Sequence, residues 1–271
     1  MPIVSIDSLD DPRIADYRAV SDPELLRWRG LFVAEGRLVV RTMLEASRFR
    51  PRSLLVTEQA RLTLAGLLEP LGEALTVHVA SVELLSAVVG FNVHRGCLAL
   101  VERPAPVAVN DLLVGLPRRA TVVLLEGVGN ADNVGGIFRN ALAFGAAAIV
   151  LGPGCCDPLY RKATRVSIGA TLRVPFATTV DWPADLERLR DSGFTVVALT
   201  PDPTAEDVSA FATAAADSGR VALLLGAEGP GLTPASLAAA DRRVRIPMAG
   251  GVDSINVATA AAIVLHRLGP R

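Results

Sequence analysis

Five nearly continuous apolar runs in the second half of the 271-residue chain constrain its fold more than any other feature. Parallel strands buried on both faces have this composition, whereas a strand with one face in water alternates apolar and polar residues. Stretches of helical length separate the runs, so the pattern predicts a doubly wound α/β domain with a parallel sheet. The runs are TVVLLEG (121–127), AAIVLG (147–152), FTVVALT (194–200), VALLLGAEG (221–229) and VRIPM (244–248).

The first half predicts a smaller α/β domain. Strands are expected at 52–57, 75–80 and 95–103, and helices at 37–46, 58–69 and 81–89. Pro104, Pro106 and Pro117 cannot donate to a strand ladder, and they lie between the two halves. The predicted organisation is an N-terminal domain over 1–103, a linker over 104–118 and a C-terminal domain over 119–271.

Composition narrows the class of protein. The 51% hydrophobic content is enough for the cores of two domains. No apolar stretch approaches the length of a membrane span, and the first residues are acidic where a signal peptide is basic. We therefore expect a cytoplasmic protein. The three cysteines, Cys97, Cys155 and Cys156, show no zinc-binding spacing and are expected to be reduced thiols without a chemical role.

Three segments at the carboxyl ends of predicted strands combine glycines with polar side chains. They are 126–146, 225–232 and 246–264. Clefts of open parallel sheets form at the carboxyl ends of the strands, so these segments are expected to line the ligand site. None contains the glycine pattern of a dinucleotide site or a P-loop. Within the third segment, Ser254 or Asn256 is predicted to cap a helix that runs to about His266; Thr233 and Pro234 likewise mark the start of a helix.

In this order, the segments resemble the SpoU (TrmH-type) family of S-adenosylmethionine-dependent RNA 2′-O-ribose methyltransferases. The resemblance covers about 121–268, where NVGGIFRNA, LLLGAEGPGL and IPMAGGVDSINVATAAAIVL stand in place of the three family motifs. FVAEGRLVV and VHRGCLAL in the first half are similar to the small substrate-binding domain of many members. The resemblance implies methyl transfer to a ribose 2′-hydroxyl of ribosomal or transfer RNA.

The same resemblance implies a fold that general rules disfavour. Chains almost never thread their own loops, yet members of this family form a deep trefoil knot, which here would involve roughly 226–268. S-adenosylmethionine would bind in a bent form among the knotted loops. Two subunits would pack into a homodimer.

The resemblance also assigns roles to individual residues. Arg139 would act either as the base that takes the ribose proton or as a clamp on an RNA phosphate; a guanidinium is a poor base, and both roles stay open. Asn133 would open the helix that carries Arg139, and Glu228 would orient Arg139 or the substrate. Without the family motifs, Arg139 would be read as a solvated helix residue and Glu228 as an exposed turn carboxylate. The catalytic set is Asn133, Arg139, Glu228, Ser254 and Asn256.

The cofactor site is predicted from the second and third motifs. Gly226, Ile246, Ile255 and Asn256 would contribute main-chain contacts to the adenosine and apolar cover for its ring. Ile255 stands where the family more often has leucine, and Ile246 also fits a plain strand core. No metal site is expected, because His78, His94 and His266 have no partners at ligand spacing.

RNA contacts are expected to be local, because 27 basic and 28 acidic residues give a net charge of −1. The densest basic segment would contact phosphates, although a solvated helix face is the ordinary interpretation of such a run. It contains Arg161, Lys162, Arg165 and Arg173. The N-terminal candidates are Arg27, Arg29, Arg37 and Arg95.

Two other functions fit parts of the sequence. One is a catalytically silent RNA-binding relative, such as a ribosome assembly factor. The other is a nucleotide-dependent α/β enzyme that acts on a small molecule, against which the absence of phosphate motifs counts.

Overall fold

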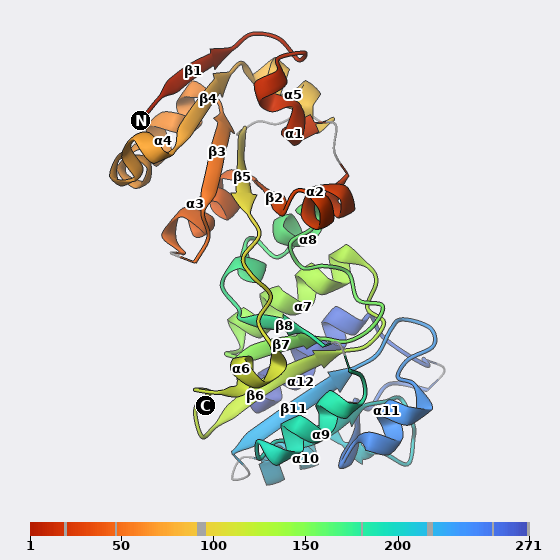
Figure 1. Cartoon of the computed structure of the whole chain (residues 1–271). Coiled ribbons are helices and arrows are strands. Elements are labelled where there is room, and N and C mark those ends of the chain that lie inside the picture. The colour runs from red at the N-terminus through yellow and green to blue at the C-terminus, as the bar shows by residue number, and fades with distance from the viewer. Residues whose placement is uncertain are drawn as a thin grey trace. The chain divides into compact units, whose positions relative to one another are not determined.

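The computed structural model describes residues 1–18, 21–46, 48–90, 96–179, 181–215, 219–250 and 252–269. The chain divides into two compact units (Figure 1). The first consists of Met1–Ala105 together with Pro158–Arg173, and the second of Pro106–Asp157 together with Val174–Arg271. The basic segment that the sequence assigned to the C-terminal domain therefore belongs to the first unit.

The first unit is built on a five-stranded mixed sheet with the order β1-β4-β3-β5-β2. The predicted strands at 52–57, 75–80 and 95–103 form β3, β4 and β5, and two further strands, β1 and β2, lie at the edges. The strands are β1 (Ile3–Ile6), β2 (Leu31–Glu35), β3 (Pro51–Val56), β4 (Thr76–Ala80) and β5 (Cys97–Glu102). The helices are α1 (Ala15–Arg18), α2 (Asp22–Trp28), α3 (Arg37–Glu45), α4 (Glu58–Leu68), α5 (Val82–Val89) and α8 (Arg161–Val166).

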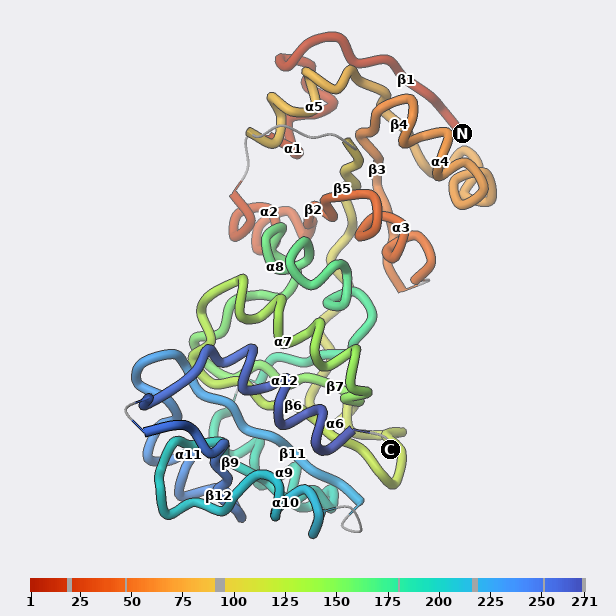
Figure 2. Tube along the Cα trace, turned by 180° about the vertical axis from the view of Figure 1, so that it is seen from behind, coloured from red at the N-terminus to blue at the C-terminus, as the bar shows by residue number. Residues whose placement is uncertain are grey.

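Strand β2 is an edge strand, yet all five of its residues are buried. Helices α2 and α8 pack against it, and both views show these helices beside each other (Figures 1 and 2). An open edge strand can pair with another chain, and the burial of β2 beside these helices leaves it less exposed to such pairing. The basic segment thus has a structural task in its own unit.

The second unit contains a seven-stranded sheet with the order β10-β12-β9-β11-β6-β7-β8, and every pairing in it is parallel. The prediction of a parallel sheet is confirmed. The sequence missed two short edge strands, β8 and β10. The strands are β6 (Ala120–Leu125), β7 (Ala148–Leu151), β8 (Phe176–Thr178), β9 (Thr195–Leu199), β10 (Glu206–Asp207), β11 (Arg220–Leu225) and β12 (Arg242–Arg245).

Helices cover both faces of this sheet, as the apolar runs require. On one face Val122 and Leu124 of β6 join a core with residues of α6 and α9; on the other side of the strands lie α7 and α12, in front in Figure 2. The proline-rich stretch predicted as a linker contains α6, because Val109, Leu112 and Leu113 bury against that core. The helices are α6 (Val109–Leu113), α7 (Ala131–Ala143), α9 (Ala184–Asp191), α10 (Val208–Ala215), α11 (Pro234–Ala239) and α12 (Val257–Leu268).

The chain leaves β6 towards β7 and leaves β11 towards β12, on opposite sides, although β6 and β11 are neighbours. Their last residues, Leu125 and Leu225, are paired in register. Such a reversal of direction opens a crevice at the carboxyl ends of the strands. The topology therefore places the segments after β6 and β11 side by side.

Ile168 carries local strain, because it has a φ of 52° with a β-branched side chain. It follows α8 and is 41% exposed. We expect Ile168→Asn to raise the free energy of unfolding by about 1 kcal/mol, since Asn tolerates the left-handed region better. Urea unfolding followed by circular dichroism measures the change. Arg173→Asn, at a φ of −107°, is the control; an equal gain in both variants would contradict the strain.

Candidate functional site

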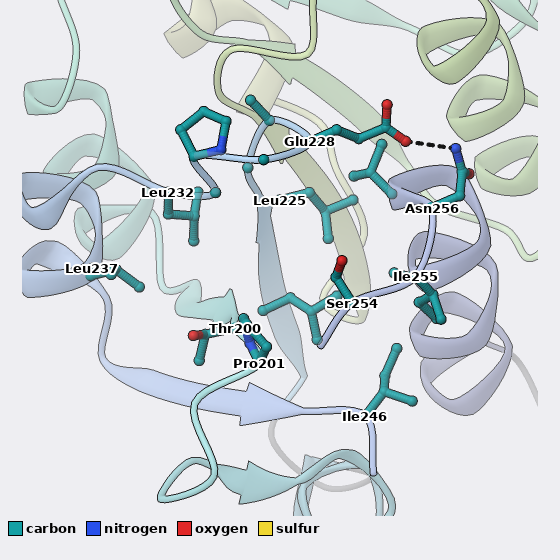
Figure 3. Close-up of a pocket in the computed structure, with 18 of the residues that line it drawn as sticks. Thr200, Pro201, Leu225, Glu228, Leu232, Leu237, Ile246, Ser254, Ile255 and Asn256 are labelled. Carbon is teal, nitrogen blue, oxygen red and sulfur yellow. Dashed lines mark hydrogen bonds between the residues drawn. The ribbon is translucent and has the colours of Figure 1, made fainter. Parts of the chain in front are cut away.

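A pocket of about 530 Å³ lies at the carboxyl ends of β9, β11 and β12 in the second unit (Figure 3). The segment after β11 and the start of α12 line it, together with Ile246 and Met248 after β12. Apolar side chains such as Leu225, Leu232 and Leu237 form much of the wall. A concave, mostly apolar pocket with a few polar groups is the usual form of a small-molecule site.

Gly226 allows the loop after β11 to fold back on itself. A Cβ at this position would lie 2.4 Å from the carbonyl carbon of Gly231 and 2.5 Å from the amide nitrogen of Leu232. Ala227 and Gly231 pair in an isolated bridge, and Gly229 and Gly231 adopt positive φ angles. The loop therefore needs glycine where the backbone crosses itself and where it turns left-handed. This tight loop brings residues 226–232 together along the pocket.

Asn256 joins three segments of the second unit with one side chain. Its Oδ1 accepts hydrogen bonds from the amides of Ala258 and Thr259 at 3.0 and 3.1 Å and so caps α12. Its Nδ2 donates to Asn133 Oδ1 and to Glu228 Oε1, both at 2.8 Å. Figure 3 shows the bond to Glu228 at one end of the pocket. Three residues predicted as catalytic are thus brought together.

Close packing of α7 against α12 holds Asn133 in place. A Cβ on Gly136 would lie 3.0 Å from the Cβ of Ala258, and Asn140 Nδ2 donates to the carbonyl oxygen of Ala258 at 2.8 Å. Asn133 is buried in the first turn of α7, whereas Asn130 is the residue that caps this helix. The prediction that Asn133 opens the helix is therefore wrong: the helix begins three residues earlier, after Asn130.

Arg139 lies on α7 but on another face than Asn133, because six residues turn a helix by about 600°. Its side chain is exposed. Within the described part of the chain, its guanidinium has neither a hydrogen bond nor an ion pair. The structure thus leaves Arg139 outside the Asn133–Asn256–Glu228 cluster and available to a ligand from solvent.

The remaining residues of the predicted site line the pocket. Ser254 and Ile255 precede the cap of α12, and Ile246 follows β12 (Figure 3). The cap of α12 is Asn256, so of the two predicted capping residues Ser254 keeps its hydroxyl for other contacts. Ile246 is only half-buried, which means that its side chain contributes to the pocket wall as well as to packing.

The sequence did not identify Glu126 or the end of β9. Glu126 is 5% exposed at the end of β6. It accepts hydrogen bonds from Trp182 Nε1, Thr233 N, Thr233 Oγ1 and Ser236 Oγ at 2.8–3.1 Å. Leu199 at the end of β9 and Thr200 and Pro201 directly after it line the pocket. A carboxylate at the end of a predicted strand, next to a glycine, was the sequence signal that could have identified Glu126. The end of β9 could be assigned to the pocket only once the order of the strands in the sheet was known.

Two of the predicted RNA-contact residues are engaged inside the first unit. Arg161 donates from Nη2 to the carbonyl oxygen of Tyr17 and from its amide to Asp22, at 2.8 and 2.9 Å. Arg165 pairs with the buried carboxylate of Glu35 at 2.7 Å. Lys162 and Arg173 are exposed, and Arg95 lies outside the described residues. Contacts within the unit thus account for part of the basic segment.

Cysteine and histidine side chains play no visible part in the pocket. Burial raises the pKa of the Cys155 thiol, and it raises that of Cys97 to about 12, so both are protonated at neutral pH. His266 packs edge-on against Phe144, burial lowers the pKa of His78, and His94 lies outside the described residues. Among the described residues no cluster of three metal-ligating side chains occurs. None of the described helices is long and apolar enough to cross a membrane.

Comparison with known proteins gives consistent results. The model of the SpoU rRNA Methylase family matches residues 120–266. An uncharacterised tRNA/rRNA methyltransferase of Mycobacterium tuberculosis is 45% identical, covering 96% of this chain and 92% of that protein. The 23S rRNA (guanosine-2′-O-)-methyltransferase RlmB of Vibrio vulnificus is 30% identical over 64% of this chain and 68% of its own.

A solved structure matches nearly the whole chain. The AdoMet-bound rRNA methyltransferase from Sinorhizobium meliloti superposes with a TM-score of 0.84 at 25% identity. The match covers 98% of this chain and 97% of that chain. Both units therefore have counterparts in one solved protein.

Asn256→Asp separates the two tasks of this side chain. The carboxylate keeps the cap of α12 but loses both amide bonds and stands against Glu228. We expect a loss of about 1–2 kcal/mol of unfolding free energy at pH 7. The loss shrinks at pH 4, because protonation of either carboxyl removes the repulsion. Urea titrations at both pH values measure it. Asn130→Asp is the control, because Asn130 caps α7 by accepting a hydrogen bond from the Asp132 amide; an equal loss there would refute the cluster.

Glu126→Gln tests the buried carboxylate. The amide oxygen of glutamine replaces one carboxylate oxygen, but its NH2 group then faces the amide of Thr233, which is a donor. We expect a loss of about 1–3 kcal/mol of unfolding free energy, the cost of a buried unsatisfied donor. Thermal and urea unfolding measure it. Glu228→Gln, at an exposed position, should cost much less; equal losses would contradict the assigned role of Glu126.

Proposed function

Because the chain belongs to the SpoU rRNA methylase family, we propose that it is an S-adenosylmethionine-dependent RNA 2′-O-ribose methyltransferase. The observation that carries the proposal is the Asn133–Asn256–Glu228 cluster at one end of the pocket. It joins residues of all three motifs through one amide group. The substrate class, ribosomal or transfer RNA, follows the names of the relatives.

The pocket suits S-adenosylmethionine by its own features. Gly229 and Gly231 line the pocket, and the space beside their Cα atoms is open, so the backbone of this loop can approach an adenosine closely. Ile246, Ile255 and Leu225 offer apolar cover for a purine, and Ser254 and Asn256 offer polar atoms. When bound, the cofactor supplies an electrophilic methyl group. The solved relative from Sinorhizobium meliloti is described as AdoMet-bound, which supports the same assignment.

The side chains of the protein would position the ribose and assist the loss of its proton. Ribose O2′ must lose its proton as it attacks, and it must be held in line with the methyl group. Glu228 Oε1 is occupied by Asn256, which orients this carboxylate towards a bound ribose. Arg139, exposed on the next turns of α7, reaches an RNA phosphate or the ribose itself. Asn133 takes part indirectly, because its Oδ1 accepts a hydrogen bond from Asn256 and so holds the Asn256 side chain in position.

The knot and the homodimer belong to this proposal. In it, residues 226–268 thread through a loop; the hydrogen bond between Asn256 and Glu228 places the start of α12 beside the loop after β11 within that range. Sedimentation equilibrium measures the dimer. A monomer at micromolar concentration would contradict that part of the proposal.

Arg139 variants test the proposed activity. Transfer of a tritiated methyl group to total RNA, with mapping of 2′-O-methyl sites, measures it. If Arg139 is a clamp, Arg139→Lys keeps part of kcat with weakened RNA binding, while Arg139→Ala loses far more. If Arg139 is the base, both variants lose roughly 10²- to 10⁴-fold in kcat with cofactor affinity intact.

Arg118→Ala is the matched control, because Arg118 is exposed before β6, at the amino end of the strands and thus away from the pocket. Its activity should equal that of the unchanged protein. Cofactor binding without methyl transfer to any RNA would favour a catalytically silent relative. Full activity in Arg139→Ala would remove this residue from the mechanism.

A further inference from the structure

Trp28 is the most exposed large apolar side chain in the described part of the chain. It is the last residue of α2 in the first unit and is 84% exposed. Burying a large apolar side chain stabilises a fold by roughly 1.5–3 kcal/mol. The exposed side chain of Trp28 contributes almost none of this stabilisation. The fold therefore does not explain why tryptophan stands at this position.

The indole stands on a firm support. Leu25 and Leu26 of α2 are buried, and α2 packs against β2. At its other end, α2 is tied to α8 by the bond from the Arg161 amide to Asp22. Arg29, directly after Trp28, forms ion pairs with Asp16 and Glu24. An exposed ring on an anchored helix loses little freedom when it binds a partner.

The surroundings of Trp28 favour a nucleic acid over a protein. Within the described segment 21–30, the other exposed residues are polar, charged, proline or glycine, so this segment gives the ring no apolar neighbour of the kind that marks a protein interface. Arg27 and Arg29 flank it in the sequence, and both are exposed. Arg27 has no hydrogen bond or ion pair within the described residues. Arg29 is neutralised by its two carboxylates, whereas a flat ring beside the unpaired cation of Arg27 suits a base and its neighbouring phosphate.

We propose that the indole of Trp28 stacks on an unpaired base of the RNA substrate, with Arg27 at a neighbouring phosphate. The inference rests on the proposed function and adds the substrate class to it: an RNA with an unpaired nucleotide in a loop or bulge. A base inside a duplex has both faces covered by its neighbours and offers no face to the ring. The first unit thus selects unpaired RNA by stacking rather than by total charge.

Fluorescence and binding test this stacking in the full-length protein. The chain has two tryptophans, Trp28 and Trp182. A short oligouridylate should quench the emission of the unchanged protein, and its duplex with oligoadenylate should not. Trp28→Phe should abolish the quenching but keep most of the affinity, because it keeps a flat ring. Trp28→Ala should weaken oligouridylate binding by roughly 5- to 150-fold, the range reported per stacked base.

Leu62→Ala is the matched control, since Leu62 is 60% exposed on α4 of the same unit and should change neither signal. Absence of quenching, or equal losses of single-stranded and duplex binding in Trp28→Ala, would overturn the proposal. A changed oligomeric state of Trp28→Ala would do so too, by showing that the ring lies in a protein interface. Methyl transfer by the unchanged protein is measured separately: quenching without transfer overturns the proposed function and supports the stacking.

Discussion

One amide side chain, that of Asn256, connects the parts of the second unit on which the site depends. It caps α12 with its oxygen and binds Asn133 and Glu228 with its nitrogen. Three segments more than twenty residues apart in the chain are thereby fixed relative to each other. A cap alone needs only an acceptor, for which Asp or Ser would serve equally. The use of asparagine indicates that the donor is needed as well.

Glycine makes that connection sterically feasible. Gly136 lets α12 approach α7 closely, and Gly226 lets the loop after β11 cross itself. Glu126 adds a buried anchor that ties the start of α11 to the end of β6 through Thr233 and Ser236. The pocket is thus walled by backbone that close packing and a buried carboxylate hold in shape. Such preorganisation is what a cofactor site requires.

The sequence predicted the elements whose pattern is strong and missed those that tertiary contacts define. Apolar runs located β6, β7, β9, β11 and β12, whereas β8 and β10 are too short to show a period. Helix α6 was not predicted, because prolines flank it and its formation depends on packing of its apolar residues against the core of the sheet. The meeting of Asn133, Glu228 and Asn256 was expected only from the family resemblance. Glu126 was missed because burial and partners decide its role, and neither is visible in a sequence.

The basic residues show why counting charges misleads. Arg161 and Arg165 looked like phosphate ligands, yet they bind Tyr17 and Glu35 and hold α8 over the edge of β2. Arginines that hold the fold together are not available to phosphates, and the net charge of −1 gives the chain no general attraction to RNA. Stacking is a sequence-tolerant source of affinity that needs no charge, because every base has a flat face. In the stacking that we propose, the exposed ring of Trp28 would supply this affinity, with Arg27 at a single neighbouring phosphate.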